Sequence, residues 1–292
     1  MDKGSWSIIV HGGAKAISPS DAEAHRQGCA RAAERGAEIL ARGGSAVDAA
    51  RRAVAMLEDD PTFNAGHGSV ANAAGDIEMD AGIMDGATLA IGAVAAVVRI
   101  HNPIDAAAAM LGEPPILLVG KGAERFAYKK GLRCTPPTGA STPPEKPGHD
   151  TVGCVARDRA GHIAAATSTG GIAGTLPGRV GDAPLPGCGF YADDKVGGVS
   201  LSGDGEAIAR TLLGARIVRA MEDRRAALAA QDIHEPMQRL GAEAGVIAID
   251  AAGRIGAAHN SENFAVAFGS SEKPVIISAI HQDEWKAVLP HD

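Results

Sequence analysis

Three glycine-rich strings in the second half of the chain carry hydroxyl and charged side chains. They are residues 149–153 (His-Asp-Thr-Val-Gly), residues 167–171 (Thr-Ser-Thr-Gly-Gly) followed by residues 178–182 (Gly-Arg-Val-Gly-Asp), and residues 202–206 (Ser-Gly-Asp-Gly-Glu). A hydroxyl such as that of Thr151 becomes a good nucleophile only when a base removes its proton. Glycines before a helix expose backbone N–H groups at its positive end, where a phosphate or carboxylate can bind.

Each string also has a purely structural interpretation. Thr151 could be the first β-branched residue of a strand, and Asp204 could cap a helix after an ordinary glycine turn. Arg179 and Asp182 could form an exposed ion pair that stabilises the protein little. The chain contains no Gly-Lys-Ser/Thr, and the third string lacks the spacing of a dinucleotide-binding loop, so a nucleotide site is not indicated there.

Taken together and in this order, the strings resemble the plant-type L-asparaginase and isoaspartyl (β-aspartyl) peptidase family. These are threonine-dependent N-terminal nucleophile hydrolases related to the glycosylasparaginases. The resemblance covers nearly the whole chain and includes residues 10–14, 44–49, 63–69 and 79–86. It implies an α+β fold, a four-layer αββα sandwich in a single domain of residues 1–292. It also implies self-cleavage into an alpha subunit, residues 1–150, and a beta subunit, residues 151–292.

The resemblance assigns the catalytic groups. Thr151, freed by cleavage after Asp150, is the nucleophile, and its own α-amine is the base, because an α-amine titrates near neutral pH. Thr169 orients the Thr151 hydroxyl. The oxyanion is bound by the Ser202 hydroxyl, where the family usually has threonine, and by the backbone N–H of Gly203.

Further residues match the substrate clamp and its support. The Arg179 guanidinium binds the α-carboxylate of an aspartyl unit and Asp182 binds its α-ammonium, which selects a free amino-acid head. Gly205 adds a backbone contact. Asn64 supports the nucleophile loop and is linked to self-cleavage.

The resemblance requires no cofactor for the reaction, but it suggests a structural sodium ion. Backbone carbonyl oxygens suit a hard cation. The carbonyls concerned are those of Leu57, Glu58, Asp60, Phe63, Ala65 and His67. Relatives assemble as dimers of processed αβ units, which makes a homo-oligomer the expectation here.

The implied activity is hydrolysis of the side-chain amide of L-asparagine or of β-aspartyl dipeptides through a β-aspartyl-enzyme intermediate. Asp150 stands where isoaspartyl peptidases more often have glycine, and His-Asp-Thr is the glycosylasparaginase pattern. Hydrolysis of N4-glycosyl-asparagine is therefore an alternative. Two others are a non-processed amino-acid-binding homologue and a protein-cleaving threonine peptidase.

The composition restricts partners and location. The formal net charge is −7, and no basic cluster occurs, which argues against nucleic acid and anionic membranes. The N-terminus lacks a secretory pattern, and the longest apolar run, residues 89–98, is too short for a membrane-spanning helix. These features favour a cytoplasmic protein, and the activity that the resemblance implies makes small molecules its substrates.

The elements that must position these residues can be predicted from periodicity and capping. A strand at residues 7–11 precedes two helices, which open at the capping boxes Ser20/Glu23 and Ser45/Asp48. A proline-rich segment, about residues 133–150, is typical of a linker. Strands are expected at 89–99, 115–119, 151–157, 163–167, 246–249, 255–258, 264–268 and 274–278, and helices from 104, at 123–130, at 206–220 and at 224–230. Helices and strands on both sides of the linker indicate sheets covered by helices.

Overall fold

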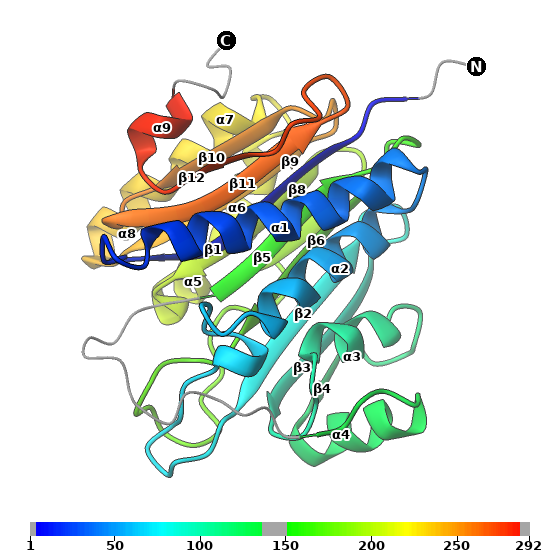
Figure 1. The fold of residues 1–292 in the computed structure, drawn as a ribbon, viewed down its shortest axis with the longest axis vertical. Helices are drawn as coiled ribbons and strands as arrows, with labels where there is room; N and C mark the ends of the chain where they lie inside the picture. Colours follow the sequence, from blue (N-terminus) through cyan, green and yellow to red (C-terminus); the bar gives the residue numbers. More distant parts are fainter. Residues whose placement is uncertain (1–3, 136–150, 287–292) are drawn as a thin grey trace.

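Two β-sheets form the centre of the protein (Figure 1). The computed structural model describes residues 4–135 and 151–286. The large sheet has the strand order β12-β11-β1-β5-β6-β2-β3-β4, and the small sheet has the order β10-β9-β8-β7. The large sheet comprises β1 (Ser7–Lys15), β2 (Met79–Asp85), β3 (Ala90–Val97), β4 (Leu117–Val119), β5 (Thr151–Arg157), β6 (Ile163–Thr169), β11 (Asn263–Ser270) and β12 (Ile277–Ala279). The small sheet comprises β7 (Phe190–Asp193), β8 (Gly197–Gly203), β9 (Ala244–Asp250) and β10 (Ile255–His259).

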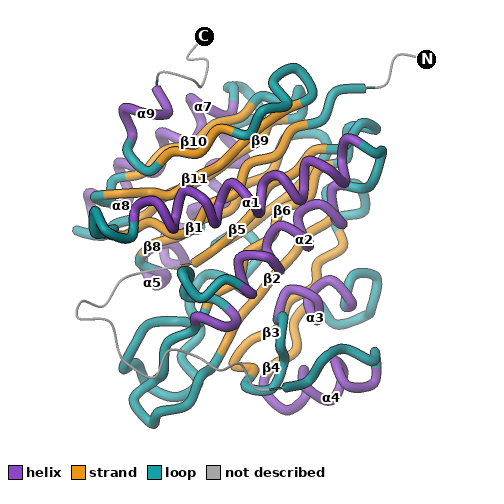
Figure 2. The backbone as a smooth tube through the Cα atoms, viewed as in Figure 1, coloured by secondary structure: helices purple, strands orange, loops and turns teal. Residues whose placement is uncertain are grey.

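Helices cover the outer face of each sheet (Figures 1 and 2). On the large sheet, α1 and α2 lie over β11, β1, β5 and β6, and α3 packs against β2 and β3. On the small sheet, α6 packs against β8, and α7 packs against β10. The helices are α1 (Ala22–Ala41), α2 (Ala46–Asp59), α3 (Pro103–Ala109), α4 (Gly120–Lys129), α5 (Gly205–Thr211), α6 (Leu213–Ala220), α7 (Ala226–Ala229), α8 (His234–Leu240) and α9 (Gln282–Lys286), with 3₁₀ turns at Gly66–Gly68 and Ala230–Ile233.

Three buried clusters fill the spaces between the four layers. Alternation along β1 sends Ile8 to the cluster under α1 and α2, whereas Ile9 joins the cluster between the two sheets. Leu201 and Ile217 belong to the third cluster, between the small sheet and its helices. The predicted α+β fold, a four-layer αββα sandwich, is confirmed.

Most predicted elements are present, including the hairpin of β5 and β6 and the start of α2. Ser45 caps α2 by accepting a hydrogen bond from the Asp48 N–H at 3.1 Å. The capping box at Ser20 is wrong, because Asp21 is the N-cap of α1 and makes no side-chain capping bond. The Ser20 hydroxyl bonds that of Ser18 at 2.7 Å instead.

A second prediction that needs correction is the single helix over residues 206–220. It is two helices, α5 and α6, which meet at Leu212 in the left-handed conformation with φ 48°. Strands β2, β7 and β8 and helices α8 and α9 were not predicted. Most of the predicted linker, residues 136–150, lies outside the described residues. Within the described residues, no helix is long and apolar enough to span a bilayer.

Candidate functional site

Thr151 is the first residue of β5, a central strand of the large sheet (Figure 1). It pairs with Thr169 on β6, and Thr169 pairs in turn with Asp80 on β2. All three side chains are buried. The two threonines that the sequence singles out are therefore neighbours on adjacent strands, with a buried carboxyl group beside them.

Ser202 links the start of β5 to β1. Its Oγ accepts hydrogen bonds from the backbone N–H of Ala14 at 3.0 Å and of Thr151 at 3.3 Å. Ala14 follows an irregularity in the β1–β11 pairing, which lies between His11 and Ala14. Among the described residues no acceptor takes the Ser202 hydroxyl hydrogen, so this hydrogen can be donated to a ligand.

Gly203 follows Ser202 in a conformation that favours glycine, with φ 145°. A Cβ at this position would lie 2.3 Å from the Glu243 carbonyl oxygen. The next residue, Asp204, caps α5 by accepting a hydrogen bond from the Ala207 N–H at 3.0 Å. The structural interpretation of Asp204 is thus confirmed, and the cap fixes the segment that carries Ser202 and Gly203.

A buried histidine that received no role from the sequence, His11, pairs with Gly153 near the start of β5. His11 Nε2 is 2.8 Å from Ser200 Oγ, and Ser200 donates to the Ala166 carbonyl at 3.1 Å. The His11 Nε2 must therefore carry the hydrogen. Burial lowers the pKa of His11 to about 3, so it is neutral and brings no positive charge to the start of β5. Gly153 leaves space for this pair, because a Cβ there would lie 1.9 Å from Ser200 Oγ.

Arg179 and Asp182 are neighbours, but the ion pair of Arg179 is with another residue. Its Nε and Nη2 donate to Glu206 Oε1 and Oε2 at 2.8 and 2.5 Å. Gly205 lies against both members of the predicted clamp, because a Cβ there would be 2.8 Å from Asp182 Oδ1 and 3.1 Å from Arg179 Nη2. The pairing with Glu206 was not predicted, since it joins residues that are 27 positions apart.

Asp182 is a buried carboxyl group with unused bonding capacity. Its Oδ2 has no hydrogen-bond partner among the described residues. Burial raises the pKa of Asp182 to about 7, although the charge of Arg179 opposes this. A cation that reached Oδ2 would satisfy the oxygen and favour the ionised carboxylate.

Asp80 is a second buried carboxyl group that feels the charge of Arg179. Its Oδ1 accepts a hydrogen bond from the Ala96 N–H at 2.8 Å. Burial raises the pKa of Asp80 to about 7, and the Arg179 charge opposes this shift. Because Asp80 pairs with Thr169 in the sheet, it connects the threonine pair to the clamp. The sequence offered a motif here but no role.

Asn64 joins two loops near Thr169. Its Nδ2 donates to the Gly171 carbonyl at 2.7 Å, and its Oδ1 accepts from the Val70 N–H at 3.0 Å. Its backbone carbonyl accepts from the Gly170 N–H at 2.8 Å. These bonds fix the chain that follows Thr169. The support of the nucleophile loop by Asn64 stays a prediction.

The six residues of the predicted sodium site lie at the end of α2 and in the loop that follows. Three of the carbonyls already accept backbone hydrogen bonds within this loop, those of Asp60, Phe63 and Ala65. A carbonyl oxygen has a second lone pair, so these bonds do not prevent coordination. No side-chain cluster suited to a metal ion occurs among the described residues. Sodium coordination by the carbonyls stays a prediction.

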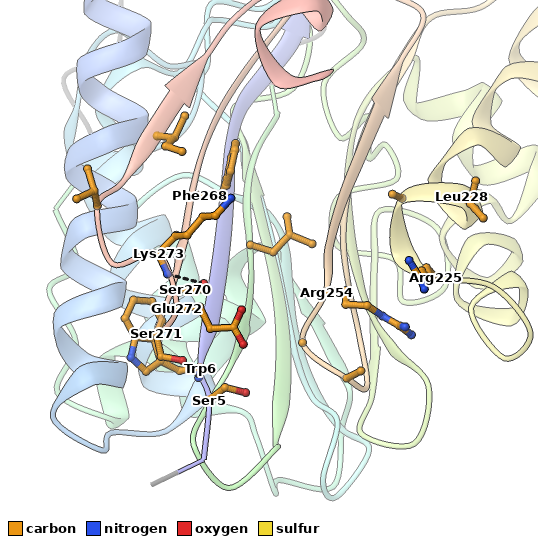
Figure 3. Close-up of a pocket in the computed structure, with 17 residues that line it drawn as sticks. Ser5, Trp6, Arg225, Leu228, Arg254, Phe268, Ser270, Ser271, Glu272 and Lys273 are labelled. Atoms are coloured by element: carbon orange, nitrogen blue, oxygen red, sulfur yellow. Dashed lines mark hydrogen bonds between the residues drawn. The ribbon is translucent and has the colours of Figure 1, made fainter. Parts of the chain in front are cut away.

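A hollow between the ends of the two sheets lies apart from these residues (Figure 3). Trp6, Phe268 and Lys273 line one part of it, and Arg225 and Arg254 line another. Trp6 precedes the strand end where Ser7 pairs with Arg157, the last residue of β5, whereas Thr151 is the first. None of the predicted site residues lines this hollow.

Comparisons with known proteins agree with the resemblance. The model of the family described as Asparaginase matches residues 4–146 and 135–277. The isoaspartyl peptidase/L-asparaginase of Rattus norvegicus is 47% identical over 229 residues, which cover 72% of this chain and 69% of the relative. The isoaspartyl peptidase of Salmonella typhimurium is 38% identical over 295 residues, which cover 90% and 94%. The chain therefore belongs to the asparaginase family.

Proposed function

We propose that this protein is an amidohydrolase that cleaves the side-chain amide of L-asparagine and the β-aspartyl bond of isoaspartyl dipeptides. The observation that carries the proposal is the alignment of Thr151, Thr169 and Asp80 on adjacent strands, with Asp80 under the influence of the Arg179 charge. Asp80 is thus beside the candidate nucleophile in the sheet and within the electrostatic influence of the candidate substrate clamp. The names of the relatives support the same two substrates.

The proposed reaction begins with cleavage of the chain between Asp150 and Thr151. Asp150 lies outside the described residues. Cleavage converts the Thr151 nitrogen, which now donates to Ser202 Oγ at 3.3 Å, from an amide to an α-amine. In its neutral form this amine takes the proton of the Thr151 hydroxyl.

The Thr151 oxygen then attacks the carbonyl carbon of the substrate amide. The Ser202 hydroxyl and the Gly203 N–H stabilise the oxyanion. The leaving ammonia or amine receives the proton held by the α-amine, which leaves a β-aspartyl ester on Thr151. Water, deprotonated by the same amine, hydrolyses the ester and restores the free threonine.

Specificity follows from two charges at a fixed separation. Arg179 binds the substrate α-carboxylate, and Asp182 Oδ2, which has no partner among the described residues, binds the α-ammonium. Only a substrate that has its scissile bond on the side chain keeps both groups free. N4-glycosyl-asparagine also has such a head, but the relatives are named for asparagine and isoaspartyl substrates, so glycosylated asparagine is not favoured.

Three expectations remain part of the proposal. The chain divides into subunits of residues 1–150 and 151–292, two processed units form a dimer, and the enzyme acts in the cytoplasm. Light scattering of the purified, processed protein checks the dimer, because a single αβ unit would scatter with half the expected mass.

The activity is tested by ammonia release from L-asparagine and by product analysis with β-aspartyl dipeptides. The matched α-aspartyl dipeptides, in which the scissile bond engages the α-carboxyl, should not be cleaved. Cleavage of both peptide types would indicate a general peptidase. Exclusive hydrolysis of glycosyl-asparagine would overturn the proposed substrates.

A further inference from the structure

We propose that Glu206 is a positioning residue of the substrate clamp. It holds the Nε–Nη2 edge of Arg179, so that the Nη1 end of the guanidinium remains for the substrate α-carboxylate. This inference rests on the proposed function and adds to it the residue that orients Arg179.

The geometry of the ion pair supports this role. Glu206 accepts one hydrogen bond from Nε and one from Nη2, at 2.8 and 2.5 Å. A guanidinium has five N–H groups in a fixed plane, so three of them, at Nη1 and Nη2, are left for a second carboxylate. The Arg179 side chain is 14% exposed and that of Glu206 is 58% exposed, which places Glu206 on the solvent side of the pair.

Glycines flank the free end of the guanidinium. A Cβ at Gly181 would lie 2.9 Å from Nη1, and a Cβ at Gly205 would lie 3.1 Å from Nη2. Any side chain at either position would therefore contact the atoms that the substrate carboxylate needs. Asp182 lies near Nη2, since the Cβ at Gly205 would also lie 2.8 Å from Asp182 Oδ1.

Glu206 also ties the clamp to the oxyanion donors. It lies in the first turn of α5, four residues after Ser202, and the Asp204 cap fixes this turn. The bonds from Arg179 to Glu206 therefore set the position of the guanidinium relative to Ser202 and Gly203. A substrate that is held by its α-carboxylate is placed at a defined distance from the reaction centre.

The charge of Glu206 has a second, measurable effect on Asp182. The charged groups that act on Asp182 are Arg179, Glu206 and Asp80, and Glu206 contributes to its raised pKa. Removal of the Glu206 charge should lower this pKa. The ammonium-binding form of Asp182 would then persist to lower pH.

Steady-state kinetics of Glu206→Gln on L-asparagine from pH 5.5 to 9 test the proposal. We expect KM to rise on the order of tenfold, equivalent to the loss of about 1.4 kcal/mol of binding, with a smaller change in kcat. The acid limb of 1/KM, which reports substrate binding by ionised Asp182 apart from the Thr151 α-amine, should also move to lower pH. Glu206→Asp keeps the charge but shortens the side chain, so it should restore the acid limb and leave KM raised.

The matched control is Glu235→Gln, which breaks a comparable exposed ion pair with Arg216 at 3.1 Å and should behave as wild type. Active wild-type protein together with a Glu206→Gln variant of unchanged KM and unchanged acid limb overturns the inference. A lower KM also overturns it, because Glu206 would then compete with the substrate. Wild-type protein that is inactive on every substrate would instead refute the proposed function.

Discussion

Replacement of Ser202 by alanine should affect both catalysis and stability, because one hydroxyl has two roles. Its oxygen accepts the N–H groups of Ala14 and Thr151, and its hydrogen is available to the oxyanion. Loss of one oxyanion donor typically lowers kcat by about 10²–10³-fold. The Ala14 N–H loses its acceptor in a fully buried region, which should lower the free energy of unfolding by about 1–3 kcal/mol.

The assay must separate a slow reaction from incomplete chain cleavage, because Ser202 contacts the Thr151 nitrogen. Ammonia release from L-asparagine is therefore divided by the fraction of processed protein, which intact mass spectrometry provides. Ser202→Thr is the control, since it retains the hydroxyl and has the residue that the family usually carries. We expect the threonine variant to retain kcat within about tenfold, which is a loss of up to about 1.4 kcal/mol.

A Ser202→Ala variant whose processed form turns over asparagine at nearly the wild-type rate would refute the oxyanion role. An unchanged free energy of unfolding in the same variant would refute the stabilising role of the oxygen as acceptor for the N–H groups of Ala14 and Thr151. The two results are independent, because the first depends on the hydrogen of the hydroxyl and the second on its lone pairs.

The remaining predictions concern buried groups around the site. Burial raises the pKa of Glu58 to about 8 from 4.5, so between these pH values the native state keeps a proton that the unfolded state loses. The free energy of unfolding of the wild type should therefore fall as the pH rises from about 4.5 to 8. Urea unfolding at several pH values should show that Glu58→Gln flattens this dependence. Because the pKa of Asp182 is raised to about 7 and its ionised form binds the α-ammonium, 1/KM should fall as the pH drops below about 7, whereas protonation of the Thr151 α-amine lowers kcat. Asp182→Asn should raise KM and abolish this acid limb of 1/KM, and an unchanged pH profile of KM would exclude the assigned role. Gly153→Ala would place a Cβ 1.9 Å from Ser200 Oγ and should lower the free energy of unfolding by at least about 1–3 kcal/mol, whereas an unchanged thermal midpoint would contradict the tight packing.

The capping pattern predicted the start of α2 correctly and the start of α1 wrongly, although the residues before the two helices are similar. Ser45 caps α2 as expected. At α1 a similar pattern is present, with Glu23 three residues after Ser20, but Asp21 occupies the cap position and Ser20 bonds Ser18. The pattern alone cannot decide between two adjacent polar residues, because the choice depends on how the preceding chain leaves β1.

The sequence predicted those parts of the site that belong to a recognisable motif or to a hairpin of consecutive strands. The expected strands 151–157 and 163–167 became β5 and β6, and their hairpin register pairs Thr151 with Thr169. Strand β8 has the sequence Gly-Gly-Val-Ser-Leu-Ser-Gly, in which the glycines interrupt the alternation of apolar and polar residues that identifies a strand. The small sheet was therefore predicted only in part.

Contacts between residues that are far apart in the chain could not be predicted from the sequence. The Glu206–Arg179 pair and the influence of Arg179 on Asp80 depend on the packing of loops and strands from different parts of the chain. No local pattern encodes these distances. Glu206 follows Gly205 within a recognised string, yet only the structure pairs it with Arg179.

The role of Thr151 as a nucleophile that its own chain cleavage exposes is tested most directly by intact mass together with asparagine hydrolysis, in wild type and Thr151→Ala. The wild type should yield two fragments, residues 1–150 and 151–292, and release ammonia from L-asparagine. The Thr151→Ala chain should remain a single, inactive polypeptide. A wild-type chain that stays intact while it hydrolyses asparagine, or a Thr151→Ala variant with wild-type turnover, would contradict this role.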